Sequence, residues 1–270
     1  MSKNPANRRP KQRPSGHCPQ TPAPLWASQN FLTSSRTIRR LLACTDISPQ
    51  DLVVQIGPGK GHITRELLPR CGSVLAAELD SALCARLRER FAGEARLRLW
   101  QGDFLTMPLP KGPYKVFANI PFSHTTDILR RLSQAPNPPA CAWLVVERGA
   151  AMRFAGQGRP GLSALMLAPF FQVRIAASIP REQFHPAPRV DAVLLELRRR
   201  PQPDLPPSQR QSFRRFLEQG LSRGALSLLS KKQLASALGR AGLPLPADDS
   251  NMKYVQWLCL FRAWRLLGRK

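Results

Sequence analysis

The chain has 270 residues, of which 41 are Lys or Arg and 17 are Asp or Glu, so its formal net charge is +24. This length fits one large domain or one large and one small domain, and hydrophobic residues at 43% exclude a mostly disordered chain. The charge indicates a polyanionic partner, and the predominance of Arg over Lys favours RNA or DNA over an anionic membrane surface. Since no apolar run approaches the ~18 residues of a membrane helix, we expect no membrane span.

Residues 1–25 are basic, rich in proline and free of acids, which predicts a disordered basic arm. The arm lacks the apolar core of a secretory signal. The six cysteines show no CxxC spacing, so we expect neither a metal site nor a disulfide framework. These features together predict a cytoplasmic protein, which we expect to be a monomer.

Short apolar runs alternate with helical patterns from residue 26 to about residue 200. This alternation predicts an α/β fold with a parallel sheet covered on both faces. The predicted strands are 51–57, 73–79, 95–100, 115–120, 142–147, 171–178 and 190–197. The predicted helices are 36–43, 62–68, 81–91 and 125–132.

Residues 198–207, RRRPQPDLPP, read as a linker between two domains. We therefore expect a catalytic domain over 26–200 and a small, positively charged, all-helical domain over 201–270. Two roles stay open for the second domain: a bundle that shields the sheet, or a surface that contacts RNA directly.

A glycine-rich turn, Gly57-Pro58-Gly59-Lys60-Gly61, follows the first long strand. Glycines there allow a tight strand-to-helix turn and let a ligand approach the backbone. A dinucleotide fingerprint requires glycine at position 62, where this chain has His62. The spacing therefore favours S-adenosylmethionine, which has no pyrophosphate.

Two acidic residues follow the next two strands. Glu78 ends the second strand and can accept both hydroxyls of a ribose. Asp103 follows Gly102 at the end of the third strand and can accept from the exocyclic amine of an adenine, although an Asx turn also explains it. Because parallel strands present their carboxyl ends at one edge of the sheet, these residues are expected to meet there.

The fourth strand ends in Asn119-Ile120-Pro121-Phe122. The Asn119 side-chain oxygen and the Ile120 carbonyl can accept the two hydrogens of an exocyclic amine and so aim its lone pair at a methyl donor. Pro121 restricts Ile120 to an extended conformation, and Phe122 offers a flat face for a base. The tetrapeptide therefore predicts methylation of a planar amine, against the alternative of a buried turn.

The ordered motifs resemble the ribosomal RNA adenine N6-methyltransferase family, and within it the Erm branch that confers macrolide–lincosamide–streptogramin B resistance. The resemblance runs from about residue 26 to the C-terminus and rests on these segments: SQNFL (28–32), GPGKG (57–61), Glu78, Gly102-Asp103, NIPF (119–122), FHPAPRV (184–190) and LLGRK (266–270).

This resemblance implies a Rossmann-like, seven-stranded methyltransferase sheet with a small helical C-terminal domain. It also implies mono- or dimethylation of one adenine in 23S rRNA near the peptidyl-transferase centre. The cofactor-binding residues that it implies are Asn30, Leu32, Gly57, Glu78, Asp103 and Asn119. The residues that it implies for holding the target base are Asn119, Ile120 and Phe122.

The chain departs from this family pattern at Gln55, where the family usually has Glu. Gln lacks the charge that could face the amino group of the cofactor, so weaker cofactor affinity is expected. Two other functions stay open: a housekeeping dimethyltransferase of small-subunit rRNA, whose branch typically reads NLPY, and a non-catalytic nucleic-acid-binding factor on the same fold.

Overall fold

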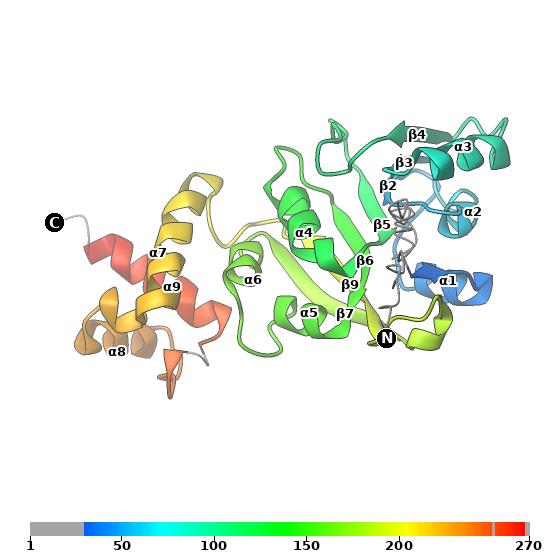
Figure 1. The fold of residues 1–270 in the computed structure, drawn as a ribbon. Helices are drawn as coiled ribbons and strands as arrows, with labels where there is room; N and C mark the ends of the chain where they lie inside the picture. Colours follow the sequence, from blue (N-terminus) through cyan, green and yellow to red (C-terminus); the bar gives the residue numbers. More distant parts are fainter. Residues whose placement is uncertain (1–29, 250–251, 268–270) are drawn as a thin grey trace, which may run out of the picture.

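The computed structural model describes residues 30–249 and 252–267, so the predicted arm over 1–25 lies outside the described residues. Its central feature is a seven-stranded sheet, with strands in the order β4-β3-β2-β5-β6-β9-β7 (Figure 1). The strands are β2 (Leu52–Ile56), β3 (Ser73–Glu78), β4 (Leu97–Gln101), β5 (Lys115–Asn119), β6 (Cys141–Glu147), β7 (Phe171–Ile179) and β9 (Ala192–Arg199).

The five strands from β4 to β6 are parallel, whereas β9 is antiparallel to both β6 and β7. The prediction of a seven-stranded α/β sheet is confirmed. The reversed direction of β9 departs from a purely parallel sheet, because the chain returns through the proline-rich bend after β7 instead of through a crossover helix.

Helices cover both faces of the sheet. Helices α1 (Ser35–Leu42), α2 (His62–Leu67) and α3 (Ser81–Arg90) lie on one face. On the other face lie α4 (Thr125–Gln134), α5 (Arg148–Phe154) and α6 (Leu162–Leu167), of which the sequence predicted only α4. Because both faces are covered, Cys141–Val146 of β6 are all buried, which explains the unbroken apolar run in the sequence.

A second, two-stranded sheet lies beside the large one and was not predicted. In it, β1 (Phe31–Leu32) pairs antiparallel with β8 (Phe184–His185). This pairing holds the beginning of the described chain next to the FHPAPRV segment, about 150 residues later in the sequence.

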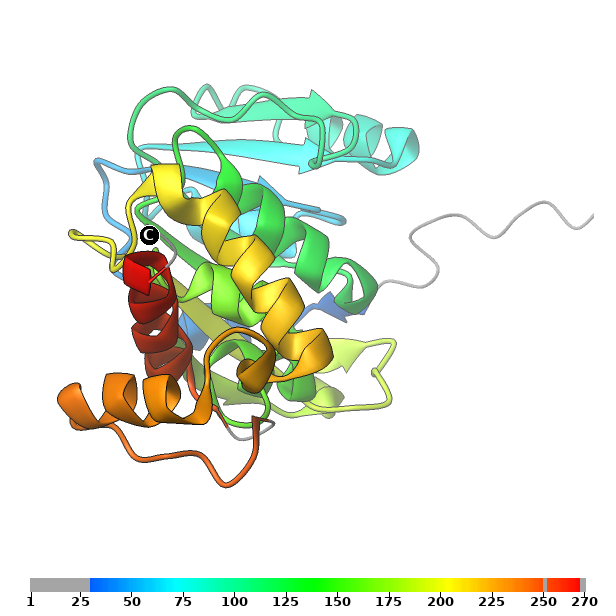
Figure 2. The ribbon, with the colours of Figure 1, turned by 90° about the vertical axis from the view of Figure 1, so that its left-hand side faces the viewer.

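The C-terminal helices are α7 (Arg210–Arg223), α8 (Lys231–Arg240) and α9 (Tyr254–Leu267), and they lie at the opposite end of the molecule from α1–α3 (Figures 1 and 2). A capping box starts α8: the Ser230 side chain accepts from the Gln233 amide, and the Gln233 side chain accepts from the Ser230 amide.

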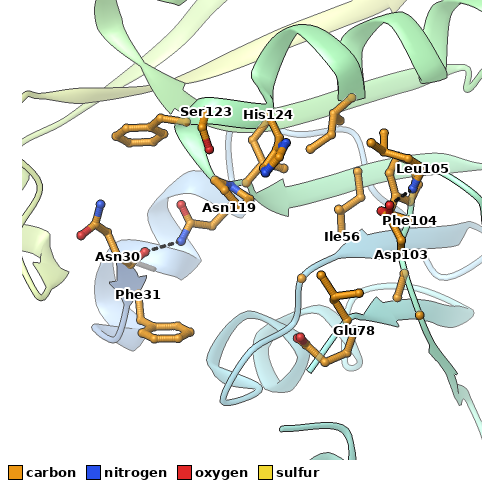
Figure 3. A pocket seen from close by; sticks show the side chains of 18 residues that line it. Asn30, Phe31, Ile56, Glu78, Asp103, Phe104, Leu105, Asn119, Ser123 and His124 are labelled. Carbon is orange, nitrogen blue, oxygen red and sulfur yellow. Dashed lines mark hydrogen bonds between the residues drawn. The ribbon is translucent and has the colours of Figure 1, made fainter. Parts of the chain in front are cut away.

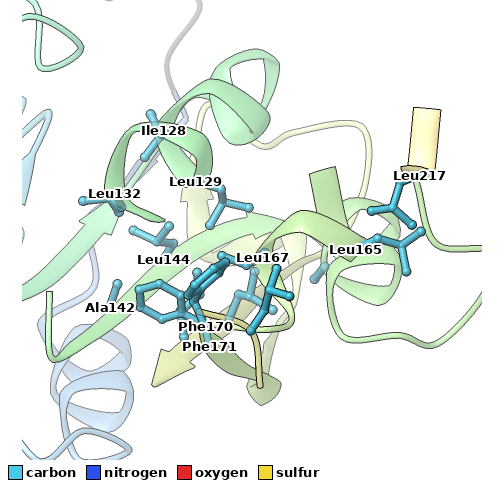
Figure 4. Close-up of a cluster of buried hydrophobic side chains, with 14 of the residues drawn as sticks. Ile128, Leu129, Leu132, Ala142, Leu144, Leu165, Leu167, Phe170, Phe171 and Leu217 are labelled. Carbon is cyan, nitrogen blue, oxygen red and sulfur yellow. The ribbon is translucent and has the colours of Figure 1, made fainter. Parts of the chain in front are cut away.

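A single hydrophobic cluster connects these helices to the sheet (Figure 4). Side chains of α4, β6 and α6 pack around Phe170 and Phe171, and Leu217 of α7 belongs to the same cluster. The segment 198–207 is not a free linker as predicted: β9 extends to Arg199, and Leu205 is 1% exposed. The division at residue 200 stays a prediction.

Candidate active site

The carboxyl ends of β2, β3, β4 and β5 surround a cavity of about 390 Å³. Gly57, Glu78, Asp103 and Asn119, each from a different strand end, all line it (Figure 3). Asn30 and Phe31 close the cavity from the β1 side. Residues that the sequence placed at four separate strand ends thus meet in one hollow, while their individual roles stay predictions.

The glycine-rich turn forms one wall of the cavity. Gly57, Gly59 and Gly61 all have positive φ, at +61°, +57° and +79°. A Cβ atom at Gly57 would meet no atom within 4 Å, so the backbone is open to a ligand at this point. At Gly59, a Cβ atom would lie 2.6 Å from the Phe31 ring, which explains why this position requires glycine.

Glu78 is 1% exposed, and two backbone amides hold its carboxylate. Gly59 N donates to Oε2 at 2.9 Å, and Asp80 N donates to Oε1 at 3.0 Å. The carboxylate therefore ties the glycine-rich turn to the end of β3. Each carboxylate oxygen has two acceptor positions, so capacity remains for the hydroxyls of a ribose.

Asp103 combines the two alternatives that the sequence left open. Its Oδ1 accepts from Leu105 N at 2.9 Å in an Asx turn, and the exposed residue also lines the cavity. Sequence reasoning missed the apolar walls beside the two acids. These walls are built by Ile56, Leu79, Phe104, Leu105 and Ile128. The available signal was that Leu79 and Phe104 directly follow the two acids.

Asn119 is held in one orientation by the main chain. Its Nδ2 donates to the carbonyl oxygen of Asn30 at 2.7 Å (Figure 3). Because a carbonyl only accepts, the amide nitrogen must face Asn30. The other amide atom, Oδ1, is buried and has no hydrogen-bond partner within the described part of the chain. A buried acceptor without a donor is ready to receive an N–H group.

The residues after Asn119 complete this side of the cavity. Ile120 is buried, and Phe122 is half-buried at the start of a short 3-10 helix over Phe122–His124. The exposed side chain of His124 also lines the cavity, beside Asn119 (Figure 3).

Two residues singled out in the sequence lie away from the cavity wall. The Leu32 side chain is 2% exposed and packs in the core on the α1 face. Gln55 is 1% exposed, and its Oε1 accepts from Thr64 Oγ1 at 2.8 Å. The expectation that position 55 faces the cofactor is therefore wrong: this side chain faces α2 in place of the cavity.

No group of three or more His, Cys, Asp or Glu side chains with metal-binding geometry occurs in residues 30–249 or 252–267. In the same ranges, no helix combines the length and the hydropathy that a membrane crossing requires.

Comparison with known proteins gives consistent relatives. Residues 27–256 match the family described as ribosomal RNA adenine dimethylase. The rRNA adenine N-6-methyltransferase of Lysinibacillus sphaericus is 32% identical over 242 residues, which cover 89% of this chain and 96% of that protein. The ribosomal RNA small subunit methyltransferase A of a Synechococcus strain is 35% identical over 222 residues, covering 77% of this chain and 78% of that protein.

Among solved structures, the crystal structure of the 23S rRNA methyltransferase ErmE superposes with a TM-score of 0.77 at 29% sequence identity. The match covers 87% of this chain and 100% of that chain, so it includes both the sheet and the C-terminal helices.

Proposed function

This chain belongs to the ribosomal RNA adenine dimethylase family, and from that premise we propose that it transfers methyl groups from S-adenosylmethionine to N6 of one adenine in 23S rRNA. The target lies near the peptidyl-transferase centre, and its methylation confers resistance to macrolide, lincosamide and streptogramin B antibiotics. The observation that carries the proposal is the orientation of the Asn119 amide, whose buried Oδ1 lacks a donor among the described residues.

The residues present fit S-adenosylmethionine. Gly57 leaves the backbone open, the fixed carboxylate of Glu78 can accept the ribose hydroxyls, and Asp103 can accept from the adenine amine. The main chain at Asn30 and Leu32 completes this side of the proposed site. When bound, S-adenosylmethionine supplies an electrophilic methyl group on a sulfonium.

The target adenine is held on the Asn119 side of the cavity. Asn119 Oδ1 and the Ile120 carbonyl accept the two N6 hydrogens, which favours a pyramidal nitrogen with a directed lone pair. Phe122 stacks on the base, a contact worth about 1–3 kcal/mol. Orientation of this kind can supply roughly 7–11 kcal/mol of a reaction barrier, so no strong general base is required.

The substrate RNA is held by positive charge outside the cavity. The C-terminal helices and the basic segment 1–25 bind phosphates, which makes the affinity dependent on salt. The target adenine is unpaired or flipped into the cavity, at a cost of a few kcal/mol. A monomeric protein acting in the cytoplasm, where ribosomes are made, completes the proposal.

Incubation of the purified protein with radiolabelled S-adenosylmethionine and either 23S or 16S rRNA tests the function. We expect label in 23S rRNA and a primer-extension stop at one adenine. Label in 16S rRNA alone would instead identify a small-subunit dimethyltransferase, a second candidate favoured by the 35% identity to the Synechococcus protein. No label in either RNA, with RNA binding intact, would identify a non-catalytic RNA-binding factor.

A further inference from the structure

Three cationic side chains surround one histidine on the outer side of the glycine-rich turn. We call Lys60, His62, Arg65 and Arg90 the basic patch; they come from the turn, from α2 and from the end of α3. Burial, and then the charges of Arg90, Arg65 and Lys60, lower the pKa of His62. The three cations therefore act at the same place, and they hold His62 neutral.

The charges of the basic patch are only partly neutralised. Lys60 is exposed, and it has no ion pair or side-chain hydrogen bond to another described residue. Arg90 donates to the main-chain carbonyl of Lys60, a contact that leaves its charge uncompensated. Arg65 donates to Ser35 Oγ and lies 3.5 Å from the Glu66 carboxylate, with its own side chain 49% exposed. An ion pair this exposed contributes little.

The basic patch adjoins the entrance of the candidate active site. Lys60 Nζ lies 5.3 Å from the centre of the Phe31 ring, and Phe31 lines the cavity. None of the four patch residues lines the cavity itself. The patch also belongs to the α2–α3 end of the molecule, opposite α7–α9 (Figure 1). An RNA strand that delivers a base to the cavity from the C-terminal helices would continue across Phe31 toward the patch.

We propose that the basic patch binds the sugar–phosphate backbone of the substrate RNA on the side of the cavity opposite the C-terminal helices. This inference rests on the proposed function and adds a second phosphate-binding surface to it. Arginine and lysine without matching acids are the donors that phosphates select, and a half-exposed aromatic ring beside them suits a nucleic acid strand. Binding on both sides of the cavity fixes which nucleotide is presented to Asn119.

The salt dependence of binding tests this proposal in the full-length protein. The double variant Lys60→Gln/Arg65→Gln removes two charges from the patch. Each lost phosphate contact lowers the slope of log K against log salt by about 0.7 to 0.9, so we expect a decrease of about 1.4 to 1.8 for 23S rRNA. The single variant Lys60→Gln removes no hydrogen bond and should show about half of this change.

Arg98→Gln is the matched control, because it removes one exposed charge from β4. Leu97 and Leu99 pack on the α1–α3 face, so alternation along the strand places Arg98 on the other face of the sheet. We expect this control to leave the slope unchanged. Circular dichroism of each variant verifies that it is folded.

Three outcomes would overturn the proposal: an unchanged slope in Lys60→Gln/Arg65→Gln, an equal change per charge in Arg98→Gln, or loss of binding to phosphatidylglycerol vesicles without any effect on RNA. The last would assign the patch to a membrane surface. Failure of the wild-type protein to methylate rRNA would refute the proposed function, whereas normal methylation with an unchanged slope would refute only the role of the patch.

Discussion

The side-chain nitrogen of Asn119 and the main-chain oxygen of Asn30 lie 2.7 Å apart, although 89 residues separate them in the chain. This hydrogen bond decides which end of the Asn119 amide is available as an acceptor. The pairing of β1 with β8 holds Asn30 in place, so a short strand outside the main sheet orients a side chain at the end of β5.

Replacement of Asn119 tests this arrangement. In Asn119→Asp, a carboxylate oxygen faces the Asn30 carbonyl and the hydrogen bond is lost; in Asn119→Ala, both amide groups are lost. We expect both variants to lower the single-turnover rate by about 100-fold or more, as removal of one aligned polar group does in other enzymes. The dissociation constant for 23S rRNA should stay within about twofold, since RNA affinity comes mainly from phosphate contacts. A normal rate in Asn119→Ala would refute the assigned role.

Phe122 is expected to act on the base and not on the cofactor. Loss of stacking in Phe122→Ala removes about 1–3 kcal/mol, which weakens capture of the target base roughly 5- to 150-fold. The apparent KM for 23S rRNA measures this effect, and calorimetric titration measures cofactor binding. Phe122→Tyr keeps the aromatic face and serves as the control. A greater loss in cofactor affinity than in base capture would contradict the assignment.

The C-terminal helices and the sheet are expected to unfold together, because one hydrophobic cluster contains side chains of both. Arg210 reinforces this junction: its guanidinium lies 4.0 Å from the centre of the Phe170 ring and donates to the Ser133 carbonyl at 3.1 Å. Burial lowers the pKa of Arg210. Scanning calorimetry should show one transition, and Arg210→Ala should lower the free energy of unfolding by about 2 kcal/mol.

Arg214→Ala is the control for this prediction. Arg214 is exposed on the same helix and pairs with Glu218 at 2.8 Å, so its loss should cost less than about 0.5 kcal/mol. Two separate calorimetric transitions in the wild-type protein would show that the helices fold independently of the sheet.

Gln55→Glu places a carboxyl group in the interior, next to Thr64. Burial should raise its pKa above the unfolded value of about 4.3, so the folded state keeps the proton to higher pH than the unfolded state. Stability relative to the wild type should therefore fall as the pH rises above about 4.3, by about 1.4 kcal/mol for each unit of the shift.

The difference in Tm between Gln55→Glu and the wild type at pH 5 and pH 8 measures this effect. Gln101→Glu, at an exposed strand end, should show no such fall. Cofactor affinity should not increase in Gln55→Glu, since position 55 does not line the cavity; a clear gain in affinity would contradict the geometry.

The sequence was sufficient to predict the strands and the meeting of Gly57, Glu78, Asp103 and Asn119, because apolar runs locate parallel strands and parallel strands present their carboxyl ends at one edge. The orientation of Gln55 was also accessible. Alternation along β2 places Gln55 on the same face as Val53, toward α2, and we misinterpreted it because we considered its distance along the chain from the turn and not its face.

Other features were not accessible from the sequence. The contact between Asn30 and Asn119 depends on a main-chain carbonyl, which carries no residue-specific signal. Helices α5 and α6 have only seven and six residues, too few for a clear 3.6-residue period. The tight packing of 198–207 depends on Leu205 entering a core that other segments build.

The unsatisfied oxygen of Asn119 has a consequence for the choice between purines. Guanine and hypoxanthine carry an oxygen on the ring carbon where adenine carries its amine. Two oxygen acceptors that face this position, from Asn119 and Ile120, would repel that oxygen and leave three lone-pair groups without donors. Sites built around such a match reject the wrong partner by about 10⁴-fold or more, so inosine at the target position should be a poor acceptor of methyl groups.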